Sequence, residues 1–316
     1  MPVVIAHGYP FDPTYGCDEA ALRAIRPPTP PAGFADFWRA TRSATDAVPL
    51  DLKRLPASGD HRSHVVSQVR FSTLAGHRIG AWLLEPRHGP GDRGLVIGHG
   101  YGGRSAPEVG FLPRQTVALL PCAPGVDLSA HPDLPAVADR HVVHGIAARE
   151  TYLIRACVAS LWSAASALLA LHPRIAGRLA FHGSSFGGGL GALALPWDDR
   201  YGDAFLDVPT FGHHPLRLQC VSVGSGEAVR RWRAAHPEVV EVLRFYDAAS
   251  AATLIDRPVL CAPALFDPAV PPPGQWAVAN ALPQGEIMPL SAGHHDNPHG
   301  NREQRRLREM LKRRFG

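Results

Sequence analysis

The sequence lacks the features that would place it in several specialised classes of protein. It has only five cysteines in 316 residues, and none of them stands in a CxxC spacing. This scarcity argues against a disulfide framework and against a zinc site. We expect buried thiols at all five positions, which are Cys17, Cys122, Cys157, Cys220 and Cys261.

Long apolar runs and a large excess of charge are also missing. No run reaches the roughly 18 residues that a membrane span requires, and residues 1–10 do not combine a basic start with an apolar stretch as a signal peptide does. The 32 basic side chains nearly balance the 28 acidic ones, for a net charge of +4. We therefore expect a cytoplasmic protein that binds neither nucleic acid nor membranes.

The one basic run lies near the end of the chain, from Arg302 to Arg314. Glutamates at positions 303 and 309 are interleaved with its arginines at helical spacing. We interpret this stretch as the solvated face of a helix rather than as a nucleic-acid patch.

What is present indicates a globular α/β protein. Hydrophobic residues make up 45% of the chain and charged residues 19%, which suits a sizeable buried core. Two alternating stretches, Val65 to Phe71 and His77 to Leu84, predict an antiparallel hairpin. From Gly94 onward, short apolar runs alternate with segments of helical period. This succession predicts a mostly parallel, doubly wound sheet with helices on both faces.

The predicted organisation is a single domain over residues 1–316. Residues 1–62 contain a proline cluster and a short amphipathic stretch, and they form a helical extension that we expect to pack on the core. The strands expected after the hairpin cover residues 94–98, 115–120, 178–182, 204–208, 259–264 and 286–290. The expected helices cover residues 149–171, 187–195, 229–247, 274–281 and the C-terminal stretch.

A GxSxG sequence, Gly183-Ser184-Ser185-Phe186-Gly187, follows one predicted strand directly and precedes a predicted helix. Its glycines allow the sharp turn that exposes a serine oxygen above a sheet. We predict that Ser185 is a nucleophile, the alternative being a glycine-rich turn with an idle serine.

A serine needs a base and an orienting carboxylate, which in this order of elements follow it along the chain. Asp267 comes directly after the apolar run 259–264, at the carboxyl end of a predicted strand. We predict that Asp267 is the acid of the triad. The alternative is a turn aspartate that caps the next helix.

The last predicted strand ends in a segment that carries two adjacent histidines, His294 and His295. The pattern predicts that one of them is the base, and it does not choose between them. The other would then be a loop histidine that pairs with Asp296 or with water. A metal site built from both histidines, Asp296 and His299 is the weaker alternative, because adjacent histidines rarely point at one ion. We expect neither a metal nor a cofactor.

An oxyanion hole requires backbone N–H donors beside the nucleophile. The loop His99-Gly100-Tyr101-Gly102-Gly103 follows the first parallel strand, where α/β-hydrolases supply one donor, and the second comes from the residue after the serine. We predict Tyr101 and Phe186 as these donors and a structural role for His99. The sequence thus predicts an α/β-hydrolase fold.

The chain resembles the acetyl xylan esterase and cephalosporin-C deacetylase family of carbohydrate esterases. The resemblance rests on motifs spread over nearly the whole chain. They are Phe34-Ala35-Asp36-Phe37-Trp38, Ala81 to Pro86, Val96 to Arg104, Gly183 to Gly189, Asp207-Val208-Pro209 and Phe266 to Pro272.

The resemblance implies a cofactor-independent serine carboxylesterase that removes acetyl groups from small carbohydrate or cephalosporin-like esters, in a homo-oligomer. It places Ser185 as nucleophile and Asp267 as acid. The family has a histidine followed by glutamate, which favours His295, followed by Asp296, as the base. Two positions depart from the family: Phe186 replaces a glutamine, and Pro124-Gly125-Val126 replaces an Arg-Gly-Gln motif that would have braced the site. Phe186 and Val126 predict a more apolar pocket.

Two other functions stay open from the sequence. One is a hydrolase of another bond, such as a thioesterase or a peptidase on the same scaffold. The other is a catalytically silent relative, which the loss of the Arg-Gly-Gln motif would favour.

Overall fold

The computed structural model describes residues 5–107 and 112–315. Within these residues, nine strands form one sheet in the order β1-β2-β3-β5-β4-β6-β7-β8-β9. Their bounds are β1 (Lys53–Asp60), β2 (His64–Ser72), β3 (Arg78–Pro86), β4 (Arg93–Gly98), β5 (Thr116–Pro121), β6 (Leu179–Ser184), β7 (Tyr201–Asp207), β8 (Val259–Ala262) and β9 (Gly285–Ile287).

The sheet confirms the predicted α/β-hydrolase fold. Strands β2 and β3 form the predicted antiparallel hairpin, and β5, β4, β6, β7, β8 and β9 run parallel to one another. The central parallel strands are apolar and buried almost throughout, because helices cover both of their faces. This geometry brings the carboxyl ends of β4, β6, β7 and β8 to one edge of the sheet.

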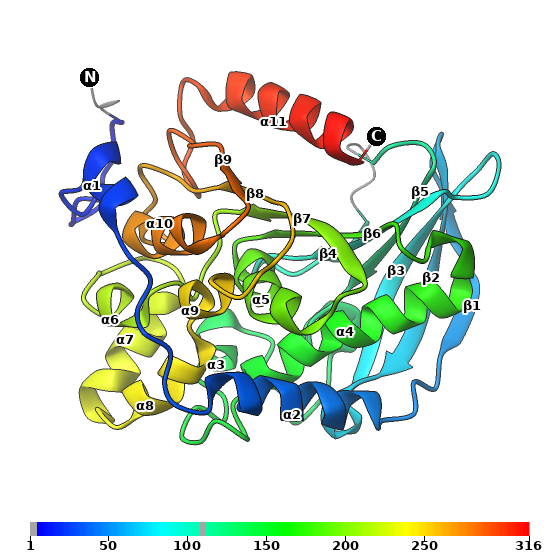
Figure 1. Ribbon diagram of the computed structural model, residues 1–316, viewed down its shortest axis with the longest axis horizontal. Coiled ribbons are helices and arrows are strands. Elements are labelled where there is room, and N and C mark those ends of the chain that lie inside the picture. Colours follow the sequence, from blue (N-terminus) through cyan, green and yellow to red (C-terminus); the bar gives the residue numbers. More distant parts are fainter. Residues whose placement is uncertain (1–4, 108–111, 316) are drawn as a thin grey trace.

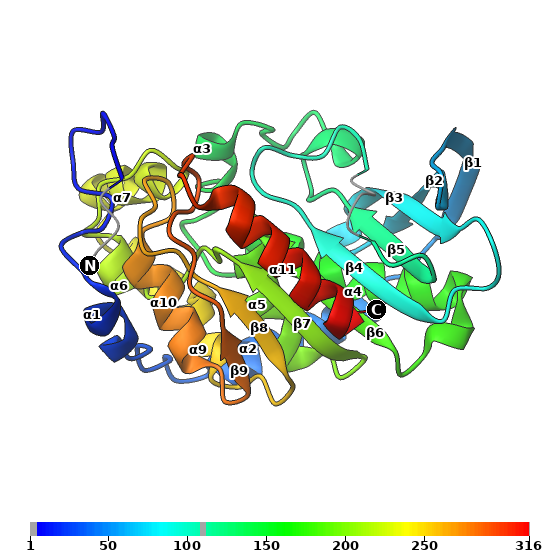
Figure 2. The same cartoon turned by 90° about the horizontal axis from the view of Figure 1, so that it is seen from above.

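The helices fall into two layers (Figure 1). Helices α2, α4 and α5 lie on one face of the sheet, and α11 runs alone across the other face, as Figure 2 shows from above. The helix bounds are α1 (Glu19–Ala24), α2 (Phe34–Asp46), α3 (Ala138–His141), α4 (Leu153–Leu171), α5 (Phe186–Ala194), α6 (His214–Arg217), α7 (Gly226–Ala235), α8 (Val239–Leu243), α9 (Ala248–Ala252), α10 (Pro272–Ala281) and α11 (Gly300–Phe315).

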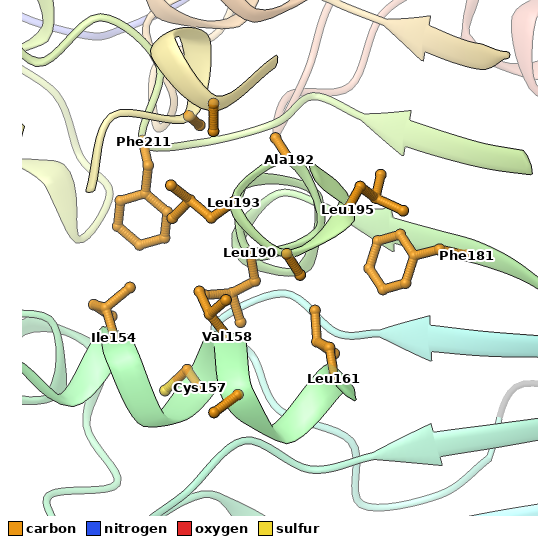
Figure 3. Close-up of a cluster of buried hydrophobic side chains, with 14 of the residues drawn as sticks. Ile154, Cys157, Val158, Leu161, Phe181, Leu190, Ala192, Leu193, Leu195 and Phe211 are labelled. Carbon is orange, nitrogen blue, oxygen red and sulfur yellow. The ribbon is translucent and has the colours of Figure 1, made fainter. Parts of the chain in front are cut away.

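The larger core cluster lies between the sheet and the layer of α2, α4 and α5. Figure 3 shows side chains of α4 pointing toward α5, which carries the residue after the candidate nucleophile at its first position. The labelled members are Ile154, Cys157, Val158, Leu161, Phe181, Leu190, Ala192, Leu193, Leu195 and Phe211. Full burial of each leucine contributes roughly 1.5–3 kcal/mol, so this packing fixes α5 firmly against the sheet.

Helix α4 is long and apolar enough, by length and composition alone, to cross a membrane. A window of 18 residues within its 19 reaches a mean hydropathy of 1.6, and 78% of that window is buried inside the protein. Such burial is what a core helix of a folded domain requires.

Several sequence predictions differ from the structure in detail. Residues 229–247, predicted as one helix, form α7 and α8 with a break at Pro237, because proline cannot donate the helical hydrogen bond. The last predicted strand is shorter, and beyond Ile287 only an isolated bridge joins Leu290 to Ala264. Strand β1 lies inside the segment predicted as helical, and it pairs with β2.

The five thiols are all free. Cys122, Cys157 and Cys261 are buried as predicted, whereas Cys17 and Cys220 are only partly buried.

Candidate active site

Ser185 lies at the tight turn between β6 and α5. Its backbone adopts φ 53° and ψ −112°, a region that costs a residue with a side chain roughly 1–3 kcal/mol. The flanking glycines leave the necessary space, because a Cβ at Gly183 would lie 2.4 Å from the carbonyl oxygen of Gly187. The N–H of Ser185 donates to the Asp207 carbonyl at 2.8 Å, which ties the turn to the end of β7.

The imidazole of His294 joins the serine to the carboxylate. Its Nε2 lies 2.9 Å from Oγ of Ser185, and its Nδ1 lies 2.8 Å from Oδ2 of Asp267. Three loops that follow β6, β8 and β9 supply these side chains, as the order of elements predicts. A hydroxyl, an imidazole and a carboxylate in this relay form an activated nucleophile with its base and orienting acid.

Asp267 is fully buried, and both oxygens of its carboxylate accept hydrogen bonds. Oδ1 accepts the N–H groups of Ala269 and Val270, both at 2.9 Å, as expected of an aspartate in a turn. Oδ2 accepts from Nε2 of Gln275 at 2.8 Å as well as from His294. These bonds fix the carboxylate toward the imidazole.

The structure contradicts the choice of His295 as the base. Its Nδ1 lies 3.3 Å from the hydroxyl of Tyr9, and its Nε2 lies 3.3 Å from the carbonyl oxygen of Ala6. His294 has a φ of 47°, which turns its own side chain toward Ser185 and leaves the next side chain pointing to the N-terminal segment. His295 therefore holds that segment, and it does not pair with Asp296.

The electrostatic surroundings of His294 favour its protonated form. Burial alone lowers the pKa of His294, but its hydrogen bond to Asp267 and the charges of Asp267 and Asp207 outweigh this, so the net pKa is raised above 6.5. A base whose imidazolium is stabilised in this way can hold the serine proton during attack.

The two predicted oxyanion donors lie in the same pocket wall as Ser185. Tyr101 belongs to the turn after β4, and Phe186 is the first residue of α5. Among the described residues, no acceptor is found for the N–H group of either one.

The loop that carries Tyr101 is braced from within. His99 has the predicted structural role: its Nε2 accepts the N–H of Ala123 at 2.9 Å, and burial lowers the pKa of His99 to about 4, which keeps it neutral. The guanidinium of Arg104 donates to the carbonyls of Ile97 at 2.8 Å and Gly98 at 3.3 Å. Arg104 thus braces this loop, although the arginine of the Arg-Gly-Gln motif is missing.

Asp127 completes the brace. Its carboxylate accepts the backbone N–H of Arg104. Gly103 has a φ of 76°, and a Cβ there would lie 2.3 Å from that carboxylate, so only glycine fits.

The pocket above Ser185 has a volume of about 290 Å³ and a mixed lining. Of the two residues expected to make the pocket apolar, Phe186 lines it, whereas Val126 lies in the core and does not. Ala269 and Val270 add to its apolar wall. The lining residues are Gly100, Tyr101, Gly102, Ser184, Ser185, Phe186, Thr210, Arg217, Gly224, Ser225, Ala269, Val270 and His294.

Sequence reasoning missed three residues of this site. Gln275 and Arg217 stand in helical stretches that give no local signal of a site. The third, Asp207, stands at the carboxyl end of β7. Its carboxylate accepts a hydrogen bond from Oγ of Ser184 at 3.0 Å. That position beside the nucleophile strand could have identified it. In residues 5–107 and 112–315 no group of three metal-type ligands is found.

Comparison with known proteins agrees with this geometry. A family described as acetyl xylan esterase (AXE1) matches residues 22–308. No curated protein sequence matches the chain.

Solved structures show the same fold at low sequence identity. An acetyl xylan esterase from Paenibacillus sp. R4 aligns with a TM-score of 0.81 at 21% identity, over 93% of this chain and 99% of its own. Acetyl xylan esterase 1 from Thermoanaerobacterium sp. JW/SL YS485 aligns with a TM-score of 0.81 at 17% identity, over 95% and 99%. An acylaminoacyl peptidase from Pyrococcus horikoshii reaches 0.62 at 14% identity, over 81% of this chain and 42% of its own.

Proposed function

Since the chain belongs to the acetyl xylan esterase family and is a carboxylic ester hydrolase, we propose that it removes acetyl and other short acyl groups from small esters of carbohydrate or cephalosporin-like alcohols. Ser185, His294 and Asp267 act as nucleophile, base and acid in this proposal. The reaction requires only the ester and water.

One observation carries the proposal. The imidazole of His294 reaches Oγ of Ser185 at 2.9 Å with one ring nitrogen and Asp267 at 2.8 Å with the other, on the wall of a pocket of about 290 Å³. A serine that is merely a turn residue needs no such relay, so the geometry supports an active enzyme over a catalytically silent relative.

The reaction proceeds in two stages. Oγ of Ser185 attacks the ester carbonyl while His294 accepts its proton, and the N–H groups of Tyr101 and Phe186 bind the oxyanion that forms. His294 then gives its proton to the departing alcohol, which leaves an acyl group on Ser185. A water molecule, deprotonated by His294, then attacks the acyl carbonyl. The bond to Oγ of Ser185 breaks, His294 returns its proton to that oxygen, and the acyl group leaves as the carboxylic acid.

The test is turnover of p-nitrophenyl acetate by the wild type and by Ser185→Ala. We expect the variant to lose at least about 10³-fold in kcat, because the acyl-enzyme cannot form. Labelling by a fluorophosphonate probe should be lost in parallel, since only an activated serine reacts readily. Equal turnover by the two proteins would disprove the assignment.

A substrate panel separates the proposal from hydrolysis of other bonds. Esters of increasing acyl length, thioesters and acylated amino acid amides are compared by kcat/KM. We expect acetyl esters to have the highest kcat/KM, because a small pocket rejects long acyl chains. A cytoplasmic location and a homo-oligomeric state stay predictions.

A further inference from the structure

Arg217 presents a buried guanidinium without an acceptor. The residue is 5% exposed, and its Nε and Nη1 atoms are buried and make no hydrogen bond in the part of the chain that the structure describes. The described residues also place no carboxylate within ion-pair distance of it. A buried charge without a partner costs several kcal/mol, so a site that keeps one is expected to serve a ligand.

The guanidinium lies in the wall of the pocket that contains Ser185. Arg217 is the last residue of α6, and its group lies over the ring of Phe211 at 5.3 Å. Gly226 also lies close to it, since a Cβ there would lie 2.8 Å from Nη2. A glycine at this position thus leaves room for the guanidinium.

No acidic side chain of the pocket competes for this charge, since none is among the lining residues. The charge of Asp247 acts on Arg217, but both of its oxygens are already occupied. They accept the backbone N–H groups of His213, His214, Ala249 and Ser250. Two titratable groups in the pocket wall have a raised pKa. His294 is engaged with Asp267, and the hydroxyl of Tyr101 lies 3.2 Å from Nδ1 of His141.

The chemistry of the group identifies what it binds. A guanidinium is planar, carries several N–H donors and matches the two oxygens of a carboxylate. We propose that Arg217 binds a carboxylate carried by the substrate, so that the enzyme prefers anionic short-acyl esters to neutral ones. This inference rests on the proposed function, and it specifies in addition that the preferred substrate is negatively charged.

The carboxylate belongs either to the acyl part or to the alcohol part of the ester, and two matched pairs separate these sources. Monoethyl succinate and ethyl levulinate differ only by a carboxylate and a methyl ketone on the acyl side. The compounds 3-acetoxypropanoate and 4-acetoxy-2-butanone differ in the same way on the alcohol side. Proton release is followed for the first pair and acetate release for the second.

The quantity compared is the ratio of kcat/KM for the anionic ester to that for its neutral partner. We expect this ratio to exceed one in the wild type for one of the pairs. Arg217→Met should lower it about 10- to 100-fold, mainly through KM, because a hydrogen-bonded charge pair typically has that effect on binding. Arg217→Lys keeps the positive charge but lacks the planar pair of N–H donors. It should therefore retain part of the preference for the anionic ester.

Arg231→Met is the matched control. Arg231 lies on the neighbouring helix α7, is largely exposed and pairs with Glu227, so its loss should leave the ratio unchanged. A wild-type ratio of one or less in both pairs overturns the inference, whether or not any variant folds. An unchanged ratio in a folded Arg217→Met protein overturns it as well.

The two proposals fail in different ways. If the wild type does not hydrolyse p-nitrophenyl acetate through Ser185, the proposed function fails. If it does so and shows no preference for charge in either pair, only the role of Arg217 fails.

Discussion

At the scale of single residues, the relay depends on two strained backbone conformations. Ser185 and His294 have φ values of 53° and 47°, which residues with side chains rarely adopt. The carbonyl oxygen of Ser185 accepts the N–H of Thr210 at 3.1 Å, and Gly293 beside His294 donates to Phe266 at 2.8 Å. These bonds hold the strain in place, and so the hydroxyl and the imidazole meet before any substrate binds.

The two neighbouring histidines should respond very differently to substitution. His294→Ala removes the base and should lower kcat for p-nitrophenyl acetate at least about 10³-fold. His295→Ala removes the contacts to Tyr9, Ala6 and the ring of Phe266 but leaves the relay in place, and it should stay within about tenfold of the wild type. Each variant serves as the control for the other, and a greater loss in His295→Ala would contradict the assignment of the base.

The structure brings Ser185 and Asp267 together as the sequence predicted, but it joins them through His294 and not through the favoured His295. Both predicted positions lie at the end of a strand, which the order of elements reveals. The choice between adjacent side chains depends on the φ value at one residue, His294, and no periodicity encodes that value. The resemblance favoured His295 through the acidic residue that follows it, and the structure gives Asp296 no part in the relay.

Asp207 should set part of the pH dependence. Burial raises the pKa of Asp207 to about 6, against the opposing effects of its hydrogen bond with Ser184 and the charge of His294. Its negative charge in turn helps to raise the pKa of His294. Because His294 acts as a base only when neutral, a higher pKa moves the acid limb of the rate profile to higher pH.

We therefore expect Asp207→Asn to move the acid limb of kcat/KM for p-nitrophenyl acetate to lower pH. Asparagine keeps an oxygen that can accept from Ser184 and removes only the charge. The wild-type limb reports both groups together, since the charge of each acts on the other. A limb at the same or higher pH in the variant would show that Asp207 does not act on His294.

At the scale of elements, the site forms where four parallel strands end. The loops after β4, β6, β8 and β9 bring the oxyanion loop, the nucleophile, the acid and the base to one edge. Apolar runs of four to six residues identified most of these strands, because helices bury them on both faces.

The elements that sequence reasoning missed are those with weak or interrupted patterns. Strand β1 is an edge strand that contains Pro56 and Gly59, and its pairing with β2 is irregular at two points. Proline and glycine are tolerated at an edge, but they remove the alternation by which a strand is recognised. Packing against β2, rather than local propensity, determines its conformation.

At the scale of the whole molecule, the helices on the two faces of the sheet are buried to different degrees. Most of the 19 residues of α4 are buried, whereas α11 buries only Leu307, Leu311 and Phe315 among its described residues. Helix α11 nevertheless contacts the active-site region, because the carboxylate of Glu303 accepts the N–H and hydroxyl of Ser291, three residues before His294.

We predict that α11 opens without global unfolding. Its few buried side chains give it a lower opening free energy than α4, so its amides should exchange with solvent hydrogen faster at low denaturant. Glu303→Ala removes the link to Ser291 and should lower the opening free energy of α11 while leaving that of α4 nearly unchanged. Native-state hydrogen exchange measures both helices in one sample. Identical free energies and denaturant dependence for α4 and α11 would mean that the molecule unfolds as one unit, and the loop of His294 would then share the stability of the main core.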